Sequence, residues 1–178
     1  MKSIQIEKFG GPEVLVIKDM DIGKPGPKEV LIKNKSIGLN FIDVYHRTGL
    51  YPIPLPSGIG LEASGVIEEI GSEVKLFKVG DRVTHASMPI GAYSEKQIMP
   101  EEKLISVPDG ISDEVASCIT LKGITAEYLL HRAYPLKKGD KVLYHAAAGA
   151  LGQILCPWAN SLGAEAVSYT HLTLPTRA

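Results

Sequence analysis

Two glycines and an alanine follow an apolar run at a spacing that suits phosphate binding. Ala147, Gly149 and Gly152 form the pattern A-x-G-x-x-G directly after the strand-forming residues 142–144. This is the spacing of the fingerprint that binds a dinucleotide pyrophosphate, with Ala in place of its first Gly. A missing side chain lets the backbone approach the phosphates at Gly149 and lets the helix pack on the strand at Gly152. The pattern predicts a dinucleotide site, and its alternative is an ordinary small-residue turn between a strand and a helix.

The elements that would position this turn are a strand over residues 141–146 and a helix over residues 150–162, which ends at Gly163. A helix N-terminus presents unpaired N–H groups and a partial positive charge, so a helix that begins near Ala150 would attract phosphates. Pro157 falls inside this helix and removes one backbone donor. We therefore expect it to kink or weaken the helix.

The part of the chain before this unit is predicted to be β-rich. Short β-favouring runs alternate with Gly, Pro and Asp turns from about residue 3 to residue 108. The Pro-dense segment 51–60 cannot be a central strand because its prolines lack N–H donors, so we expect a loop that borders a cleft. A helix is predicted to begin at Ser112 and to continue through Ala133, with Gly123 dividing it into two helices.

Composition excludes several classes of protein. The 178 residues include 44% hydrophobic ones, and the formal net charge of -1 leaves no basic stripe, so nucleic acid and membrane surfaces are not expected as partners. Cys118 and Cys156 have apolar neighbours and no C-x-x-C spacing, which predicts inert core thiols rather than disulfides or a zinc lobe. No run is long enough to span a membrane, and residues 1–11 lack the apolar core of a signal peptide, which predicts a cytoplasmic location.

Five phrases that occur in order carry a resemblance to a known family. They are FGGPEVL (9–15), IGLNFIDVYHRTGLYP (37–52), VGDRV (79–83), LKGITAEYLL (121–130) and HAAAGALG (145–152). Together they resemble the zinc-free, zeta-crystallin-like quinone oxidoreductase branch of the medium-chain dehydrogenase/reductase family, over about residues 3–166. That branch usually has Gly where this chain has Ala150 and Gln where it has Pro157.

The resemblance implies an α/β plus β fold in two domains. A GroES-like, β-rich catalytic domain is expected at residues 1–123, and the first β-α unit of a truncated NAD(P)-binding Rossmann domain at residues 124–166. The stretch VSYTHLTLPT (167–176) does not read as a continuing strand and helix of the family. It is similar to an in-frame translation of a sequencing-library adapter, so residues 167–178 are expected to be a non-native tail.

The resemblance also implies site residues. Asn40, Tyr45 and Tyr51 are expected to be catalytic, because an amide can donate to a carbonyl oxygen and a phenol ring can stack on a flat acceptor or bond to its oxygen. The residues expected to bind NADPH are Asn40, Asp43, Thr125, Tyr128, Ala147, Gly149, Ala150, Leu151, Gly152 and Gln153. No metal is expected, because Asn40, Leu61 and Lys122 stand where zinc-dependent relatives carry ligands, and none of them suits zinc.

The implied activity is zinc-independent hydride transfer from NADPH to a quinone or another electron-poor acceptor by a complete, dimeric parent protein, the present chain being inactive alone. Reduction of an enone or alkene is one alternative. A non-catalytic, NADPH- or RNA-binding, crystallin-like protein is another. The preference for NADPH over NADH comes from the resemblance alone, since the discriminating residue would fall about 20 positions past the fingerprint.

Overall fold

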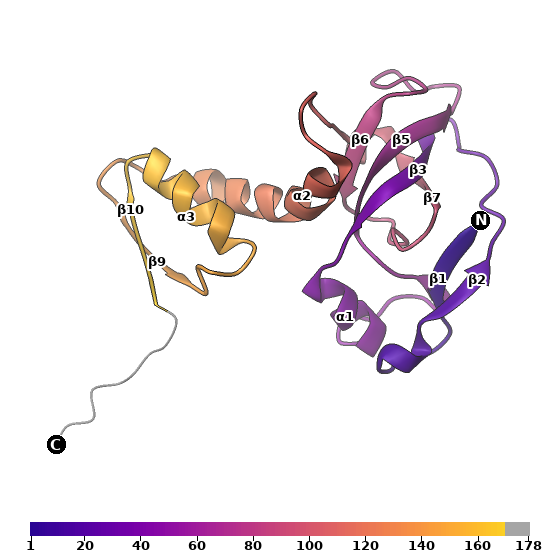
Figure 1. Cartoon of the computed structure of the whole chain (residues 1–178), viewed down its shortest axis with the longest axis horizontal. Coiled ribbons are helices and arrows are strands. Elements are labelled where there is room, and N and C mark those ends of the chain that lie inside the picture. Colours follow the sequence, from indigo (N-terminus) through magenta and orange to yellow (C-terminus); the bar gives the residue numbers. More distant parts are fainter. Residues whose placement is uncertain (170–178) are drawn as a thin grey trace. The chain divides into compact units, whose positions relative to one another are not determined.

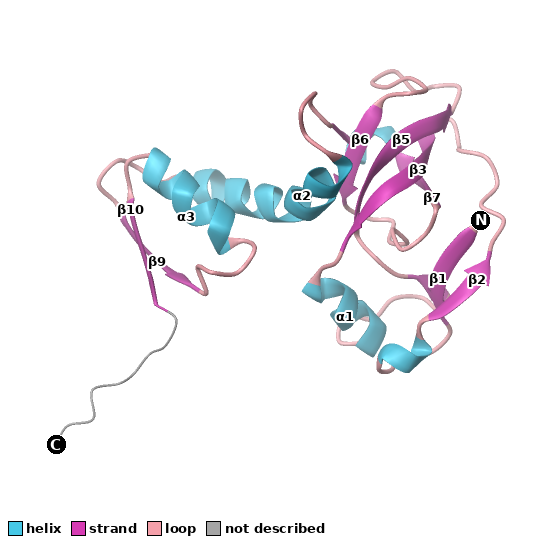
Figure 2. Cartoon of the chain, in the orientation of Figure 1, coloured by secondary structure: helices cyan, strands magenta, loops and turns pink. Residues whose placement is uncertain are grey.

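The computed structural model describes residues 1–169, which fall into two compact units, Met1–Thr120 and a second that begins at Leu121. Figure 1 and Figure 2 show strands dominating the first unit, whereas the second contains helical segments and a pair of strands. The prediction of a β-rich part followed by a β-α unit is confirmed. No helix among residues 1–169 is long and apolar enough to span a membrane.

The first unit contains two antiparallel sheets. The five-stranded sheet has the order β7-β3-β5-β6-β8 and the three-stranded sheet the order β2-β1-β4. An isolated β-bridge pairs Ser3, in β1, with Ser94, two residues before β7. The strands are β1 (Lys2–Ile6), β2 (Val16–Asp19), β3 (Glu29–Gly38), β4 (Ser57–Gly58), β5 (Glu62–Ile70), β6 (Arg82–Ala86), β7 (Lys96–Pro100) and β8 (Ile105–Ser106).

The main core of this unit lies on one face of the five-stranded sheet. Ile32, Ile67, Val83 and Met99 are almost fully buried and belong to one cluster. Because side chains alternate between the faces of a strand, β-branched residues spaced two apart, such as Val30 and Ile32, fill this face together. The shape of the β-rich unit therefore follows from its strand-forming residues.

Three short helices connect these strands. The helix α1 (Phe41–Thr48) directly follows β3 and ends at Gly49, whose φ of 83° is the left-handed conformation that glycine adopts without strain. The Gly10 N–H donates to the Arg47 carbonyl at 3.0 Å, which ties α1 to the N-terminal segment. The other two are the 3₁₀ helices η1 (Pro12–Val14) and η2 (Glu101–Lys103).

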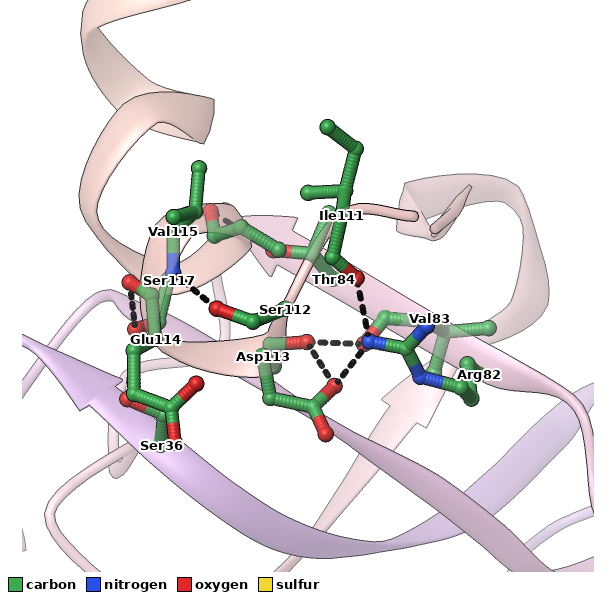
Figure 3. A network of polar contacts seen from close by, with 12 residues as sticks. Ser36, Arg82, Val83, Thr84, Ile111, Ser112, Asp113, Glu114, Val115 and Ser117 are labelled. Carbon is green, nitrogen blue, oxygen red and sulfur yellow. Dashed lines mark hydrogen bonds and ion pairs between the residues drawn. The ribbon is translucent and has the colours of Figure 1, made fainter. Parts of the chain in front are cut away.

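The long helix α2 (Asp113–Glu127) begins in a polar network (Figure 3). The Asp113 carboxylate accepts hydrogen bonds from Ser64 Oγ at 2.9 Å and from Arg82 Nη2 at 3.1 Å. Arg82 Nη2 also donates to the Ile111 carbonyl at 2.7 Å. Ser112 Oγ accepts the Val115 N–H at 3.3 Å, so the predicted helix start is confirmed.

Two sequence-based expectations for this helix are wrong. Gly123 does not divide it: α2 runs unbroken to Glu127 and continues as η3 (Tyr128–Ala133), a π-helix. A glycine costs a helix interior only about 1 kcal/mol, which is too little to break a helix whose first turn is fixed by charged hydrogen bonds. Cys118 is exposed rather than buried, because this part of α2 meets the sheet through hydroxyls such as those of Ser117 and Thr120.

The second unit is a β-α-β unit. The strands β9 (Lys141–His145) and β10 (Glu165–Tyr169) are parallel, and α3 (Gly152–Ser161) joins them. Leu130, Leu155 and Ala159 are buried in its core. Gly163 follows the helix as the predicted cap, with a φ of 83° and its N–H donating to the Asn160 carbonyl at 2.9 Å.

Both elements at the turn are shorter than predicted. The strand ends at His145 rather than at 146, and the helix runs from Gly152 to Ser161, through Pro157, rather than over 150–162. Residues 167–169, expected to lie in a tail that does not continue as a strand, belong to β10, whose register pairs Val167 with Leu143. Strand pairing with β9 decides their conformation. The rest of the expected tail, residues 170–178, lies outside the described residues.

A buried histidine in β6 makes the stability of the first unit depend on pH. His85 is 1% exposed, and its burial lowers its pKa from 6.5 to about 4. Since this folded-state pKa lies below the unfolded one, the stabilisation is fully present above pH 6.5 and is lost as the pH falls toward 4.

We predict that lowering the pH from 7 to 5 removes about 2 kcal/mol of unfolding free energy through His85 alone. The measurement is urea unfolding followed by circular dichroism at both pH values. His85→Leu should remove this part of the pH dependence, whereas His145→Gln, at an exposed position, should leave it in place. Equal pH dependence in His85→Leu and the parent chain would contradict the prediction.

Candidate functional site

The turn after β9 is shaped by close backbone contacts. Ala146 has a φ of 58°, which is unusual for a residue with a side chain, and its carbonyl accepts the Gly149 N–H at 2.8 Å. A Cβ added to Gly152 would lie 2.5 Å from both the Cα and the carbonyl oxygen of Ala147. No side chain fits there, so Gly152 allows the start of α3 to pack against the end of the strand, as the fingerprint requires.

The N-terminus of α3 offers conditions that suit an anion. Gly149 and Ala150 are exposed, and the first turn of α3 contains no acidic residue. Leu151 precedes the helix and provides no side-chain cap. The Gln153 N–H bonds to the Gly149 carbonyl at 3.0 Å, and Gln153 Nε2 bonds to the Ala148 carbonyl at 2.9 Å, which brace the turn. The predicted residues 147–153 therefore gather in one turn with the positive end of a helix dipole.

A second predicted group gathers in the first unit around the start of α1. Asn40 is 8% exposed, and its Nδ2 donates to Glu62 Oε2 at 2.8 Å. The Asn40 N–H donates to Asp43 Oδ2 at 2.9 Å, within a capping box at the start of the helix. The Tyr93 hydroxyl donates to the same Asp43 oxygen at 2.8 Å. These four side chains form one connected network.

Burial sets the electrostatics of this network. Desolvation raises the pKa of the Asp43 carboxyl, while the hydrogen bonds from the Asn40 N–H and the Tyr93 hydroxyl oppose that rise. Desolvation, followed by the hydrogen bond to Asp43, raises the pKa of the Tyr93 phenol, so Tyr93 keeps its proton at neutral pH. Asp43 and Tyr93 thus form a fixed support for Asn40.

Aromatic rings lie beside Asn40 on α1 and the segment that follows it. The Tyr45 ring meets Phe41 and Tyr51 edge to face, with centroid distances of 5.4 Å and 5.2 Å. Phe41 is 73% exposed and Tyr51 is 51% exposed. Exposed aromatic faces at this spacing provide flat apolar surface on which a planar molecule can stack.

Thr125 and Tyr128, the remaining predicted residues, lie in the second unit, where α2 changes to the π-helix η3. Thr125 Oγ1 donates to the Leu121 carbonyl at 2.7 Å, and Tyr128 is 54% exposed. The Tyr134 N–H bonds to Leu129 five residues earlier, which is the π-type spacing. π-helical turns often occur at functional sites.

Sequence reasoning missed Glu62, Tyr93, Phe41 and Ala146. Glu62 could have been found from the sequence, because it lies between Leu61 and Ala63 in a β-favouring run that is expected to be buried. A buried carboxylate needs a hydrogen-bond or charge partner. Phe41 could have been found from its position between Asn40 and Tyr45. Among residues 1–169 the structure has no group of three or more His, Cys, Asp or Glu side chains that could hold a metal ion.

The close approach at Gly152 leads to a stability prediction. Gly152→Ala should lower the unfolding free energy of the second unit by about 1–3 kcal/mol, because its Cβ would collide with the Ala147 backbone. The matched control is Gly123→Ala, where nothing lies within 4 Å of the added Cβ. In that helix interior the same change should raise stability by about 0.5–1 kcal/mol. Fluorescence of Trp158, the single tryptophan, reports unfolding, and effects of the same sign would contradict the packing argument.

Comparison with known proteins places this chain in a family. The model of the alcohol dehydrogenase GroES-like domain matches residues 26–134. A quinone oxidoreductase of Pseudomonas aeruginosa is 53% identical over 167 residues, with 93% of this chain and 51% of that protein covered. A 2-haloacrylate reductase of a Burkholderia species is 47% identical, with 91% and 50% covered.

Solved structures agree with this placement. The crystal structure of Escherichia coli quinone oxidoreductase complexed with NADPH matches with a TM-score of 0.91 at 45% identity, covering 94% of this chain and 52% of that one. The chain spans about half the length of the relatives it matches. It belongs to the alcohol dehydrogenase GroES-like domain family, whose model matches more than half of its residues.

Proposed function

We propose that this chain forms the acceptor site and the first part of the cofactor site of an NADPH-dependent quinone oxidoreductase that works without zinc. The turn at residues 146–152 carries the proposal, because its geometry leaves no space for a side chain at Gly152 and exposes Gly149 at a helix N-terminus. The E. coli relative, whose structure is described as complexed with NADPH, supports the choice of cofactor.

The residues present fit a dinucleotide. The backbone from Gly149 to Gly152 and the N-terminal turn of α3 would hold the pyrophosphate, since no acidic residue opposes it there. Thr125, Tyr128, Asn40 and Asp43 are also proposed to contact the cofactor. When bound, NADPH supplies the hydride.

The acceptor would be held by the first unit. Asn40 would donate an amide hydrogen bond to the acceptor oxygen, and Tyr45 and Tyr51 would border a flat ring. A quinone is already electron-poor, so this chain's residues need to orient it and exclude competing reactions rather than polarise it with a metal. We assign the proton that completes the reduction to solvent rather than to a tyrosine, because an ordinary phenol, with a pKa near 10, is a weak acid at neutral pH.

One observation favours a second acceptor class. The Burkholderia relative is named a 2-haloacrylate reductase and is almost as similar as the named quinone oxidoreductases. A 2-haloacrylate carries an activated double bond rather than a quinone ring. The same amide donor at Asn40 could bind its carboxylate or carbonyl oxygen, so the two substrate classes differ in ring stacking and not in the hydride step.

The acceptor class is tested in a chimaera in which the matched 167 residues of this chain replace the corresponding half of the P. aeruginosa quinone oxidoreductase. We expect NADPH oxidation that depends on added 1,4-benzoquinone, with kcat/KM at least tenfold above that for 2-chloroacrylate. Dialysis against EDTA should leave turnover unchanged. Faster turnover of 2-chloroacrylate would favour the second class, and loss of turnover on chelation would refute the zinc-free mechanism. Sedimentation of the same chimaera tests the proposed homodimer.

The cofactor site is tested by charge. Gly149→Asp in the chimaera should weaken NADPH binding at least a hundredfold in calorimetry, because it adds bulk and negative charge where the pyrophosphate would lie. Asn160→Asp, at an exposed position near the other end of α3, adds the same charge and should change binding less than threefold. Equal affinities for Gly149→Asp and the parent chimaera would refute the assignment.

A further inference from the structure

A buried carboxylate contacts the proposed amide donor from inside the first unit. Glu62 is the first residue of β5 and is completely buried, and its Oε2 accepts from Asn40 Nδ2 at 2.8 Å. The two residues are 22 positions apart in the sequence. A buried carboxylate without partners is very costly, so its position beside the Asn40 amide is a specific arrangement.

The backbone around Glu62 is built to bring it close. Gly38 ends β3 and pairs with Glu62 across the sheet. A Cβ added to Gly38 would lie 2.6 Å from Glu62 Oε2 and 2.1 Å from the Ser117 carbonyl oxygen. Only glycine fits between the carboxylate and α2, so the Glu62 side chain has little room to move away from Asn40.

An asparagine amide has two ends that differ in hydrogen bonding. Its nitrogen donates and its oxygen only accepts, and a flip about the last side-chain bond exchanges them. A carboxylate accepts only, so a flipped Asn40 would bring its Oδ1 against Glu62 Oε2, oxygen to oxygen. The carboxylate therefore admits one of the two orientations, and Asp43 fixes the backbone of the same residue.

We propose that Glu62 is a positioning residue that holds the Asn40 amide in the single orientation in which its free N–H is available to the acceptor. The orientation of the Asn40 amide is inferred from the contacts described above, and its effect on catalysis rests on the proposed function. Glutamine at position 62 would keep the shape of the side chain but could accept or donate. Position 62 would then no longer exclude the flipped orientation of the Asn40 amide.

The first test uses the chain itself and needs no cofactor. The sequence contains three asparagines, Asn34, Asn40 and Asn160, so selective ¹⁵N-asparagine labelling gives three side-chain NH₂ pairs. The Asn40 pair, assigned by its loss in Asn40→Ser, should contain one proton shifted strongly downfield by the carboxylate. In Glu62→Gln that shift should collapse while the Asn34 and Asn160 pairs stay in place. The control is Glu69→Gln, an exposed carboxylate on the same strand. An unchanged Asn40 pair in Glu62→Gln would overturn the proposal.

The second test uses the chimaera and separates positioning from folding. Glu62→Gln should lower kcat for the quinone about tenfold, with KM for NADPH within twofold and Tm within a few degrees of the parent. Glu69→Gln should turn over like the parent. Unchanged kcat in Glu62→Gln would overturn the catalytic part, as would a loss of activity matched by a loss of folded protein. If the parent chimaera does not reduce quinones, the proposed function fails, and the NMR result still decides whether Glu62 orients Asn40.

Discussion

The site in the first unit depends on the way Asn40 is held at two points, by its backbone and by its side chain. The Asp43 carboxylate accepts a hydrogen bond from the Asn40 backbone N–H, and the Glu62 carboxylate accepts one from the Asn40 side-chain amide. Two buried carboxylates therefore fix one neutral residue. This joins the end of β3, the start of α1 and the start of β5. Tyr93 adds the segment before β7 through its bond to Asp43. Because hydrogen bonds to charged groups are strong and directional, these segments are joined firmly through Asn40 and Asp43.

The second unit depends on a different constraint, which is that position 152 must have no side chain. Its turn works because a Cβ at position 152 would lie only 2.5 Å from the Ala147 backbone, so the helix can start this close to Ala147 only with glycine there. Gly149 is exposed, and the first turn of α3, at the positive end of the helix dipole, contains no acidic side chain. The two sites thus use opposite means: one fills its surroundings with hydrogen bonds, and the other keeps its surroundings free of side chains.

Local rules explain which parts of this structure could be predicted from sequence. The start of α2 near Ser112, the end of α3 at Gly163 and the strand before the turn follow from capping and turn chemistry within a few residues. The predicted break at Gly123 is wrong because the low helix propensity of glycine costs little free energy, and the anchoring of α2 by Asp113 outweighs it.

Features that depend on distant residues could not be read from local patterns. Residues 167–169 were expected to belong to a tail that does not continue as a strand, but pairing with β9 makes them part of β10. The resemblance implied roles for Asn40, Tyr45 and Tyr51, whereas the partner that holds Asn40 lies 22 residues away and was marked only by a carboxylate within a β-favouring run. Ala146 adopts its left-handed φ because the strand and the helix on either side of it must meet.

The π-helix at Tyr128–Ala133 has a consequence for how this segment tolerates changes of length. In an α-helix one inserted residue rotates everything that follows by about 100°, which would move the buried side chain of Leu130 out of the core. A π-helical turn is wider than an α-helical one and contains one more residue, so the residues after it keep their orientation. The ion pair between Glu127 and Arg132, five residues apart, spans this turn. Deleting one residue there would close the turn to α geometry and leave Glu127 and Arg132 four residues apart, the spacing at which ion pairs form on an α-helix.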